Sequence, residues 1–363
     1  MNARRRVWTA TFGGALAVSM AVIGQPATAS PAPSASTMNA AFTQAASEFD
    51  VPRDLLVAVG YSETHLDGHA GKPSQDNGYG VMHLVSNPER QTLERAAKLT
   101  GASKAELKRN DAANIRGGAA LLRSYADKAG LKASDRDRVA AWYPAVAGYG
   151  GAESEQTARL YADAAYDFVN KGVRGKTADA KGVRTAAHKV TPDRGKLAKV
   201  SSKPGIMSDD YPAAIWNPAN AANYATGRTA AISQVIIHVT EGSYAGSISW
   251  FQDPAAEVSA HYVVRSSDGE ITQMVRDADT AWHARSGNAS GLGIEHEGYV
   301  DDPSWFTDAM YRSSAALTKH LCDVHGIPKD RAHIVGHSEV PGNDHTDPGP
   351  NWNWDTYMSY VTG

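Results

Sequence analysis

The chain has 363 residues, of which 42% are hydrophobic and 21% are charged. This length exceeds the usual size of one hydrophobic core, so we expect two folded domains. The formal net charge of −3 does not suggest a nucleic-acid-binding protein, and the single cysteine, Cys322, excludes an internal disulfide. Stability must therefore come from packing, with a bound metal ion as a further source.

The first 29 residues have the pattern of a signal peptide. Arg4-Arg5-Arg6 precede an apolar stretch from Trp8 to Ile23, and Ala27-Thr28-Ala29 supplies the small residues that a signal peptidase reads. Thr, Ser and Gly interrupt the apolar stretch, which is shorter than the ~20 residues of a membrane span. We therefore predict cleavage after Ala29, secretion to the extracellular space or cell wall, and a mature protein without a membrane span. Loss of the three arginines changes the net charge from −3 to −6.

A Pro/Ser/Ala-rich linker at residues 30–37 precedes a region, residues 38–170, that has the spacing of amphipathic helices. Apolar residues recur there three and four positions apart, and the alternation typical of strands is nearly absent. The clearest runs are Phe42-Ala46-Phe49, Leu55-Leu56-Val59, Leu93-Ala96-Ala97, Ile115-Ala119-Leu122 and Tyr161-Ala164-Ala165-Phe168. We expect a mainly α-helical domain.

Four segments of this helical region resemble the lysozyme-like lytic transglycosylases. They are residues 49–63, 78–84, 114–118 and 146–151. The resemblance implies that Glu63 is a general acid that protonates a glycosidic oxygen.

Three positions depart from the transglycosylase pattern. Thr64 follows the glutamate where serine is usual, His83 stands where glutamine is usual, and Ala147-Gly148-Tyr149 replaces Ala-Tyr-Asn. These departures fall at sugar-binding positions. Glu63 is therefore a catalytic acid of a bifunctional wall lysin, part of a glycan-binding domain without turnover, or a structural residue.

Residues 171–207 form a basic segment without aromatic side chains. From 171 to 203, ten Lys and Arg against two Asp give a net charge of +8. Because this composition buries little apolar surface, we expect a flexible linker. Its charge either attracts anionic cell-wall polymers or is incidental to a soluble linker.

Strand-like apolar runs alternate with helix patterns in the rest of the chain, residues 208–363. We expect strands at residues 234–239, 259–264, 271–275, 292–296 and 332–335, and helices at 246–252 and 307–324. This alternation indicates an α/β domain with one central mixed sheet flanked by helices.

Three polar residues lie at or beyond the ends of these strands. His238 is near the end of its strand, His337 follows another strand, and Asp347 lies ten residues further in a Gly/Pro-rich loop. Two neutral imidazoles and a carboxylate can make a three-ligand Zn²⁺ site with an open fourth position, as hydrolytic zinc enzymes require. The spacing does not match a sequential zinc motif, and a strand histidine taken alone is more often a core residue than a ligand.

From about Ile232 to Trp354 the chain resembles the zinc-dependent N-acetylmuramoyl-L-alanine amidases. This family belongs to the same superfamily as the animal peptidoglycan recognition proteins and the phage T7 lysozyme-type amidases. Six motifs occur in that family's order. They are Ile237-His238-Val239-Thr240, Ser259-Ala260-His261-Tyr262-Val263-Val264, Ala281-Trp282-His283-Ala284, Gly293-Ile294-Glu295, Gly336-His337-Ser338 and Thr346-Asp347-Pro348-Gly349. The resemblance implies a zinc ion held by His238, His337 and Asp347, a catalytic Glu295, and His345 at a position that is often lysine.

The resemblance further implies hydrolysis of the amide bond between N-acetylmuramic acid and L-alanine in peptidoglycan or a muropeptide. Glu295 then takes the proton of water and returns it to the leaving nitrogen, while zinc and His345 stabilise the oxyanion. Histidine loses its charge near neutral pH and lysine does not, so activity is expected to fall at alkaline pH if His345 must be charged. Glu297 is the competing base, and His261 and His283 are expected to support the pocket or the fold.

A function of another class stays open. The protein could be a peptidoglycan-binding module that has the same pocket and does not hydrolyse its ligand. The loss of a single metal ligand would favour that class. Because His238, His337, Asp347 and Glu295 are all present, the sequence favours the enzyme.

Overall fold

The computed structural model describes residues 37–177, 181–200 and 206–363. The predicted signal peptide at 1–29, and the linker at 30–37 apart from Thr37, lie outside the described residues. Ser36–Gly363 form one compact unit. No helix within the described ranges has the length and apolar character needed to cross a membrane.

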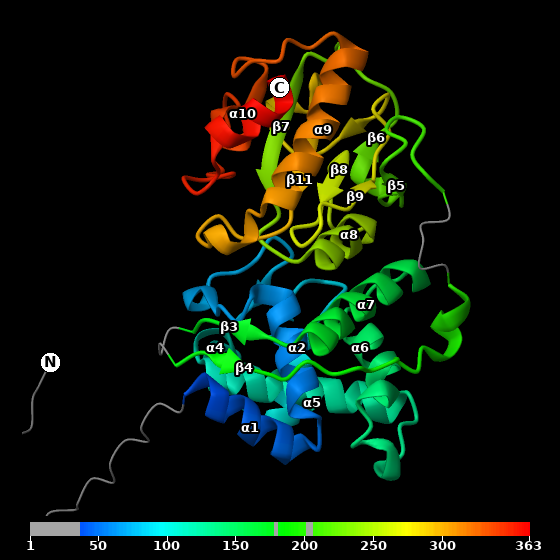
Figure 1. Ribbon diagram of the computed structural model, residues 1–363, viewed down its shortest axis with the longest axis vertical. Helices are drawn as coiled ribbons and strands as arrows, with labels where there is room; N and C mark the ends of the chain where they lie inside the picture. Colours follow the sequence, from blue (N-terminus) through cyan, green and yellow to red (C-terminus); the bar gives the residue numbers. More distant parts are fainter. Residues whose placement is uncertain (1–36, 178–180, 201–205) are drawn as a thin grey trace, which may run out of the picture. The chain divides into compact units, whose positions relative to one another are not determined.

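The described residues from 38 to 171 form seven α-helices (Figure 1). They are α1 (Met38–Phe49), α2 (Arg53–Thr64), α3 (Thr92–Thr100), α4 (Lys104–Arg109), α5 (Asp111–Lys128), α6 (Tyr143–Tyr149) and α7 (Glu155–Lys171). Two short strands, β1 (Gly78–Tyr79) and β2 (Leu84–Val85), pair antiparallel between α2 and α3. The predicted helical content is confirmed, and the lysozyme-like character of the region stays a prediction.

Helix α5 packs against α1, α3 and α6 and also supports the turn between β1 and β2. A Cβ at Gly118 of α5 would lie 2.6 Å from the side chain of Met82, so the absence of a side chain there admits the turn. Asn114 of α5 holds the same turn, because its Oδ1 accepts the backbone N–H of Met82 at 2.7 Å. The segment around Met82 is therefore fixed to the centre of the helical region.

The segment predicted as a flexible linker, residues 171–207, contains two short strands in its described part. Strands β3 (Arg174–Gly175) and β4 (Val183–Arg184) pair antiparallel. Val183 and Leu197 are buried in the core of the helical region. A few widely spaced apolar side chains can anchor a basic segment when neighbouring helices supply the rest of the core, and the flexibility of this segment stays a prediction.

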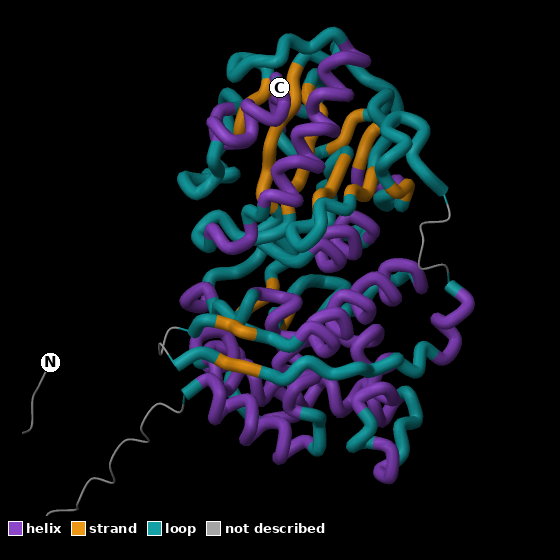
Figure 2. The backbone as a smooth tube through the Cα atoms, in the orientation of Figure 1, coloured by secondary structure: helices purple, strands orange, loops and turns teal. Residues whose placement is uncertain are grey.

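The region from residue 208 contains a mixed β-sheet (Figures 1 and 2). The sheet has six strands in the order β12-β7-β11-β8-β9-β5. Its strands are β5 (Ile215–Trp216), β7 (Gln234–Val239), β8 (Tyr262–Val264), β9 (Ile271–Gln273), β11 (Gly291–His296) and β12 (Ile334–Gly336). Strands β12, β7, β11 and β8 are parallel, and β9 is antiparallel to β8. The predicted central mixed sheet is confirmed.

Helices cover both faces of this sheet. Helices α9 (Asp308–His325) and α10 (Trp354–Thr362) share a core with one face, and α8 (Tyr244–Gln252) packs on the other. Beside the main sheet, β6 (Tyr224–Ala225) pairs with β10 (Thr280–Ala281).

Side chains alternate between the two faces along a strand, and this alternation decides which of them project from the face opposite α9. Val235 and Ile237 of β7 pack in the α9 core, whereas Ile236 belongs to a cluster on the opposite face. His238 follows the alternation of Ile236 and projects away from α9. The register places Glu295 of β11 beside His238, so both side chains project from the same face.

Candidate active site

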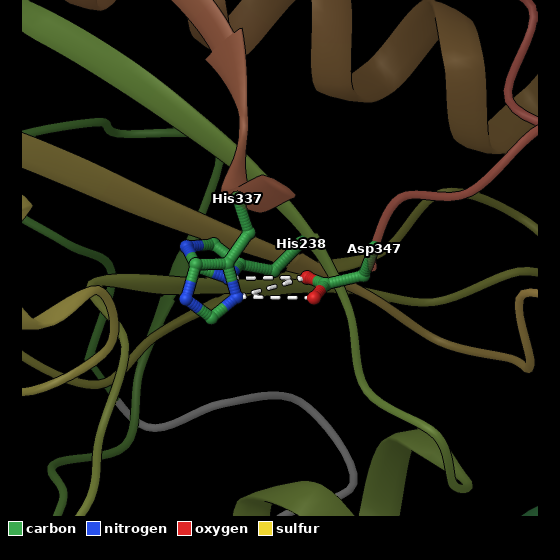
Figure 3. A group of neighbouring side chains, drawn as sticks. All are labelled: His238, His337 and Asp347. Carbon is green, nitrogen blue, oxygen red and sulfur yellow. Dashed lines mark hydrogen bonds and ion pairs between the residues drawn. The ribbon is translucent and has the colours of Figure 1, made fainter. Parts of the chain in front are cut away.

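His238, His337 and Asp347 meet at the carboxyl ends of the parallel strands. They come from the end of β7, the turn after β12 and the loop that follows. One nitrogen or oxygen of each residue lies within 4.8 Å of those of the other two. Figure 3 shows the three side chains converging, with His238 Nδ1 3.3 Å from Asp347 Oδ2 and His337 Nδ1 3.0 Å from Asp347 Oδ1.

The cluster is nearly closed to solvent, since His238, His337 and Asp347 are 1%, 5% and 7% exposed. Burial, which outweighs the nearby Asp347, lowers the pKa of His238 to about 4 and keeps its imidazole neutral. Burial alone would raise the pKa of Asp347, but its contacts with the imidazoles of His238 and His337 hold it below its usual range. Two imidazole nitrogens and a carboxylate are a donor set that suits zinc, so these residues fit a three-ligand site with an open position.

His283 lies directly beside His238. Its Nδ1 is 2.9 Å from His238 Nε2, so a proton on Nε2 can donate to His283 and leave His238 Nδ1 free as a ligand. Burial, followed by the proximity of His238, lowers the pKa of His283 well below its usual value, which keeps it a neutral acceptor. Gly293 makes room for this ring, because a Cβ there would lie 2.6 Å from the imidazole.

Glu295 lines the same cavity as the three clustered residues. It is 4% exposed, and its Oε2 has no hydrogen-bond partner among the described residues. Burial and then the charges of Asp347 and Glu241 raise its pKa well above the usual value. A buried carboxyl that lines a cavity, has an oxygen without a hydrogen-bond partner and has a raised pKa shows the properties of a general acid or base.

Two other predicted candidates, Glu297 and His261, are absent from the described lining of the cavity. Glu297 accepts the backbone N–H groups of Tyr244 at 2.8 Å and Ser266 at 2.7 Å. Nδ1 of His261 accepts the backbone N–H of Gly293 at 3.0 Å. Both side chains therefore support the backbone around the site.

His345 lies at the rim of the cavity. Its side chain is 58% exposed, and its Nδ1 is 3.8 Å from Asp347 Oδ1. The ring stacks on His337 with 4.4 Å between the ring centroids. His345 can therefore present a donor to a ligand that enters the open side of the cluster.

Glu241 is a cavity residue that sequence reasoning missed. It follows β7 with a φ of +46°, and its Oε1 accepts the backbone N–H of Val300 at 2.9 Å. Burial, more than the neighbouring Asp301 and Asp347, raises its pKa to about 7. A carboxylate three residues after His238, at the end of the same strand, was the available signal.

The cavity has a volume of about 500 Å³ and includes residues of the helical region. Pro73, Ser74 and Gln75 line it together with His238 and Glu295. No sequence pattern links this segment to the sheet, because its position depends on packing between residues far apart in the chain.

Glu63, the candidate acid of the helical region, is enclosed on all sides. It is 1% exposed. Tyr161 donates its hydroxyl to Oε1 at 2.6 Å, Ser243 donates to Oε2 at 3.1 Å, and His83 Nδ1 lies 3.5 Å from Oε2. Both oxygens of Glu63 therefore have partners, in contrast to Glu295.

Comparisons with known proteins place the similarity over the sheet region. Residues 228–350 match a family model described as N-acetylmuramoyl-L-alanine amidase. The chain is 43% identical over 171 residues to N-acetylmuramoyl-L-alanine amidase A of Achromobacter lyticus, an alignment that covers 42% of this chain and 96% of that relative.

A second relative and a solved structure are also similar. The chain is 40% identical over 113 residues to 1,6-anhydro-N-acetylmuramyl-L-alanine amidase AmpD of Haemophilus influenzae, over 29% of this chain and 59% of that relative. A crystal structure of a selenomethionine AmpD derivative aligns at 26% identity with a TM-score of 0.36, over 43% of this chain and 99% of that chain.

Proposed function

The chain belongs to the N-acetylmuramoyl-L-alanine amidase family, and from that premise we propose that it is a zinc-dependent hydrolase. The bond cleaved joins N-acetylmuramic acid to the L-alanine of the stem peptide, in peptidoglycan or a released muropeptide. The observation that carries this proposal is the cluster of His238, His337 and Asp347 in the cavity that Glu295, with its unpartnered Oε2, also lines.

We assign His238, His337 and Asp347 as the zinc ligands. A divalent ion held there supplies a Lewis acid that activates water and, by its charge, favours the ionised form of Glu295. His283 orients His238 through the 2.9 Å contact between their rings. The backbone N–H of Val239 lies 3.4 Å from Asp347 Oδ2 and orients the carboxylate.

Glu295 carries the proton in this proposal. Its carboxylate accepts a proton from the attacking water, and the carboxyl then gives this proton to the nitrogen of L-alanine as the C–N bond breaks. The products are the lactyl carboxylate and a stem peptide with a free amine. Burial favours the protonated form of Glu295, so the carboxyl can hold the proton after taking it from water and before giving it to the nitrogen. His345 donates to the developing oxyanion, an interaction commonly worth about 3 kcal/mol.

We further propose that the protein acts outside the cell. Support comes from the signal-peptide pattern of residues 1–29 and from the cell-wall bond that the family hydrolyses. The basic segment 171–207 is proposed to attract anionic wall polymers through its exposed lysines and arginines.

Mass spectrometry of peptidoglycan digested by the mature protein tests the function. We expect free stem peptides that begin with L-alanine, their loss after treatment with a chelator, and their return when Zn²⁺ is added. Glu295→Gln is expected to abolish the same products while the protein still binds zinc. Retention of the protein on insoluble wall with no products would contradict hydrolysis and leave a binding module.

A further inference from the structure

The helical region contributes a wall to the amidase cavity. This wall, Pro73-Ser74-Gln75, lies outside the family match at residues 228–350 but lines the cavity that holds His238 and Glu295. The backbone N–H of Gln75 lies 3.4 Å from the carbonyl oxygen of Glu241. The side chain of Gln75 is exposed and makes no hydrogen bond to the described protein, so its amide is free for a ligand.

Ring contacts hold the wall close to the sheet region. The ring of His69 stacks on Tyr299 with 3.8 Å between the centroids, and the ring of His65 stacks on Trp305 at 3.5 Å. Ala245 of α8 is itself a member of the hydrophobic core of the helical region. These contacts are buried or half-buried and fix the segment between α2 and β1 against the loops around the cavity.

A chain of polar contacts leads from the wall to Glu63. Ser74 donates its hydroxyl to Asp76 at 2.7 Å, and Asp76 Oδ1 lies 3.0 Å from His83 Nε2. His83 Nδ1 lies 3.5 Å from Glu63 Oε2, which accepts the hydroxyl of Ser243 at 3.1 Å. Glu63 therefore joins the base of the wall to Ser243, the N-cap of α8 in the sheet region.

We propose that the wall Pro73-Ser74-Gln75 is a saccharide-binding subsite of the amidase and that Glu63, acting through His83, positions it. The proposal rests on the amidase function given above and adds a second region of the chain to the substrate site. Glu63 is then a positioning residue and does not act on a glycosidic bond.

The chemistry of the wall suits an uncharged ligand group. Its three side chains carry a pyrrolidine ring, a hydroxyl and an amide, and the neighbouring carboxyl of Glu241 disfavours a ligand carboxylate. Sugar hydroxyls and acetamido groups both donate to and accept from an amide such as that of Gln75. Among the described lining residues the arginine is Arg285, which suits the carboxylates of the stem peptide better.

Steady-state kinetics of Gln75→Ala on two substrates test the subsite. One substrate is the disaccharide tripeptide, and the other is the lactoyl tripeptide, which has the same scissile amide and no sugar. We expect KM for the disaccharide substrate to rise roughly 2- to 10-fold, the effect of one neutral hydrogen bond, with kcat and the lactoyl substrate little changed. Gln44→Ala, at an exposed glutamine of α1 outside the cavity, is the matched control.

Three outcomes would overturn the subsite. Equal losses on both substrates would assign the wall to the stem peptide, and no loss on either would show that the wall does not contact the substrate. A loss of the same size in Gln44→Ala would show that the effect of Gln75→Ala is not local.

Glu63→Gln and Ser243→Ala test the positioning role from the two sides of one hydrogen bond. Each is expected to raise KM for the disaccharide substrate, with kcat and the lactoyl substrate little changed, in protein confirmed to be folded by circular dichroism. A fall in kcat on both substrates would indicate a general structural defect and overturn the role. Anhydro-muramyl products from wild type that disappear in Glu63→Gln would overturn it as well.

A binding measurement separates failure of the subsite from failure of the amidase function. If the wild-type protein cleaves neither substrate, the proposed amidase function is contradicted. Calorimetric titration with the disaccharide of N-acetylglucosamine and N-acetylmuramic acid, in the presence of a chelator, then tests the wall alone. Weaker binding by Gln75→Ala supports the subsite, and equal binding overturns it.

Discussion

Two buried glutamates, one in the helical region and one on the sheet, have opposite surroundings. Glu63 is 1% exposed and Glu295 is 4% exposed, so burial does not distinguish them. Glu63 has hydrogen-bond partners on both oxygens, from Tyr161 and Ser243. Glu295 has an unpartnered Oε2 and lines the cavity beside the histidine cluster.

The difference shows what a catalytic carboxyl requires beyond burial. A general acid or base must reach the proton that it transfers, so one of its oxygens has to face the substrate. Glu295 lines the cavity and has an oxygen without a hydrogen-bond partner, whereas the hydroxyls of Tyr161 and Ser243 occupy the oxygens of Glu63. A family motif locates a glutamate in the chain, and only the surrounding contacts decide whether it can react.

The largest expected effect is the loss of catalytic rate when Glu295 is replaced. Glu295→Gln is expected to lower kcat by roughly 10²- to 10⁴-fold, the usual contribution of a positioned acid or base. Release of stem peptide measures it, with Glu106→Gln, at an exposed glutamate of α4, as the control. A variant that keeps more than a tenth of wild-type kcat would place the proton transfer elsewhere.

The next effect is on stability, and here we expect the substitution of Glu63 to cost more than the substitution of Glu295. Glu63→Gln disrupts a buried carboxylate with a histidine partner, which commonly costs about 3 kcal/mol or more. Glu295→Gln removes a buried carboxyl with a free oxygen and is expected to leave the melting temperature unchanged or raised. Thermal unfolding of both variants without metal compares them. A larger loss in Glu295→Gln would contradict the assignment.

His283 should affect the metal more than the fold. His283→Ala removes the acceptor of His238 Nε2, and loss of such a contact typically lowers metal affinity about 10- to 100-fold. Competition with a chromophoric chelator measures zinc affinity directly, and His333→Ala, at a surface histidine, serves as the control. Unchanged affinity would mean that His238 is oriented without His283.

The smallest effect is a pH dependence that comes from His83. Burial alone would lower its pKa, but the carboxylates of Asp76 and Glu63 raise it above the usual value of 6.5. Its contribution to stability is therefore complete below pH 6.5 and is lost as pH rises through the raised pKa. The difference in melting temperature between wild type and His83→Gln should be larger at pH 6 than at pH 9. A difference that grows with pH would contradict this sign.

Much of the sheet region was predictable because strand periodicity is strong there. The run at residues 234–239 coincides with β7, and the helix expected at 307–324 lies within one residue of α9. The short elements β5 and β6 were missed, since two residues carry no periodicity. Helix α10 was also missed, although Tyr357 on it is fully buried.

The candidate site was also predictable from the sequence only in part. His238, His337, Asp347 and Glu295 were expected from motifs, and the structure brings them to one cavity. The burial of Leu197 in the segment 171–207 was not foreseen from the charge of that segment, because composition does not show which core a few apolar residues can join.

The sequence by itself determined the type of the main elements and the identity of the chemical groups, because periodicity and residue type are local properties. Only the tertiary structure decided which groups are free to act. Whether Glu63 or Glu295 keeps an unpartnered oxygen, and whether Gln75 reaches the cavity, depends on contacts between residues as far apart as Glu63 and Ser243. Such contacts are set by the packing of whole elements, and no local pattern in the chain encodes them.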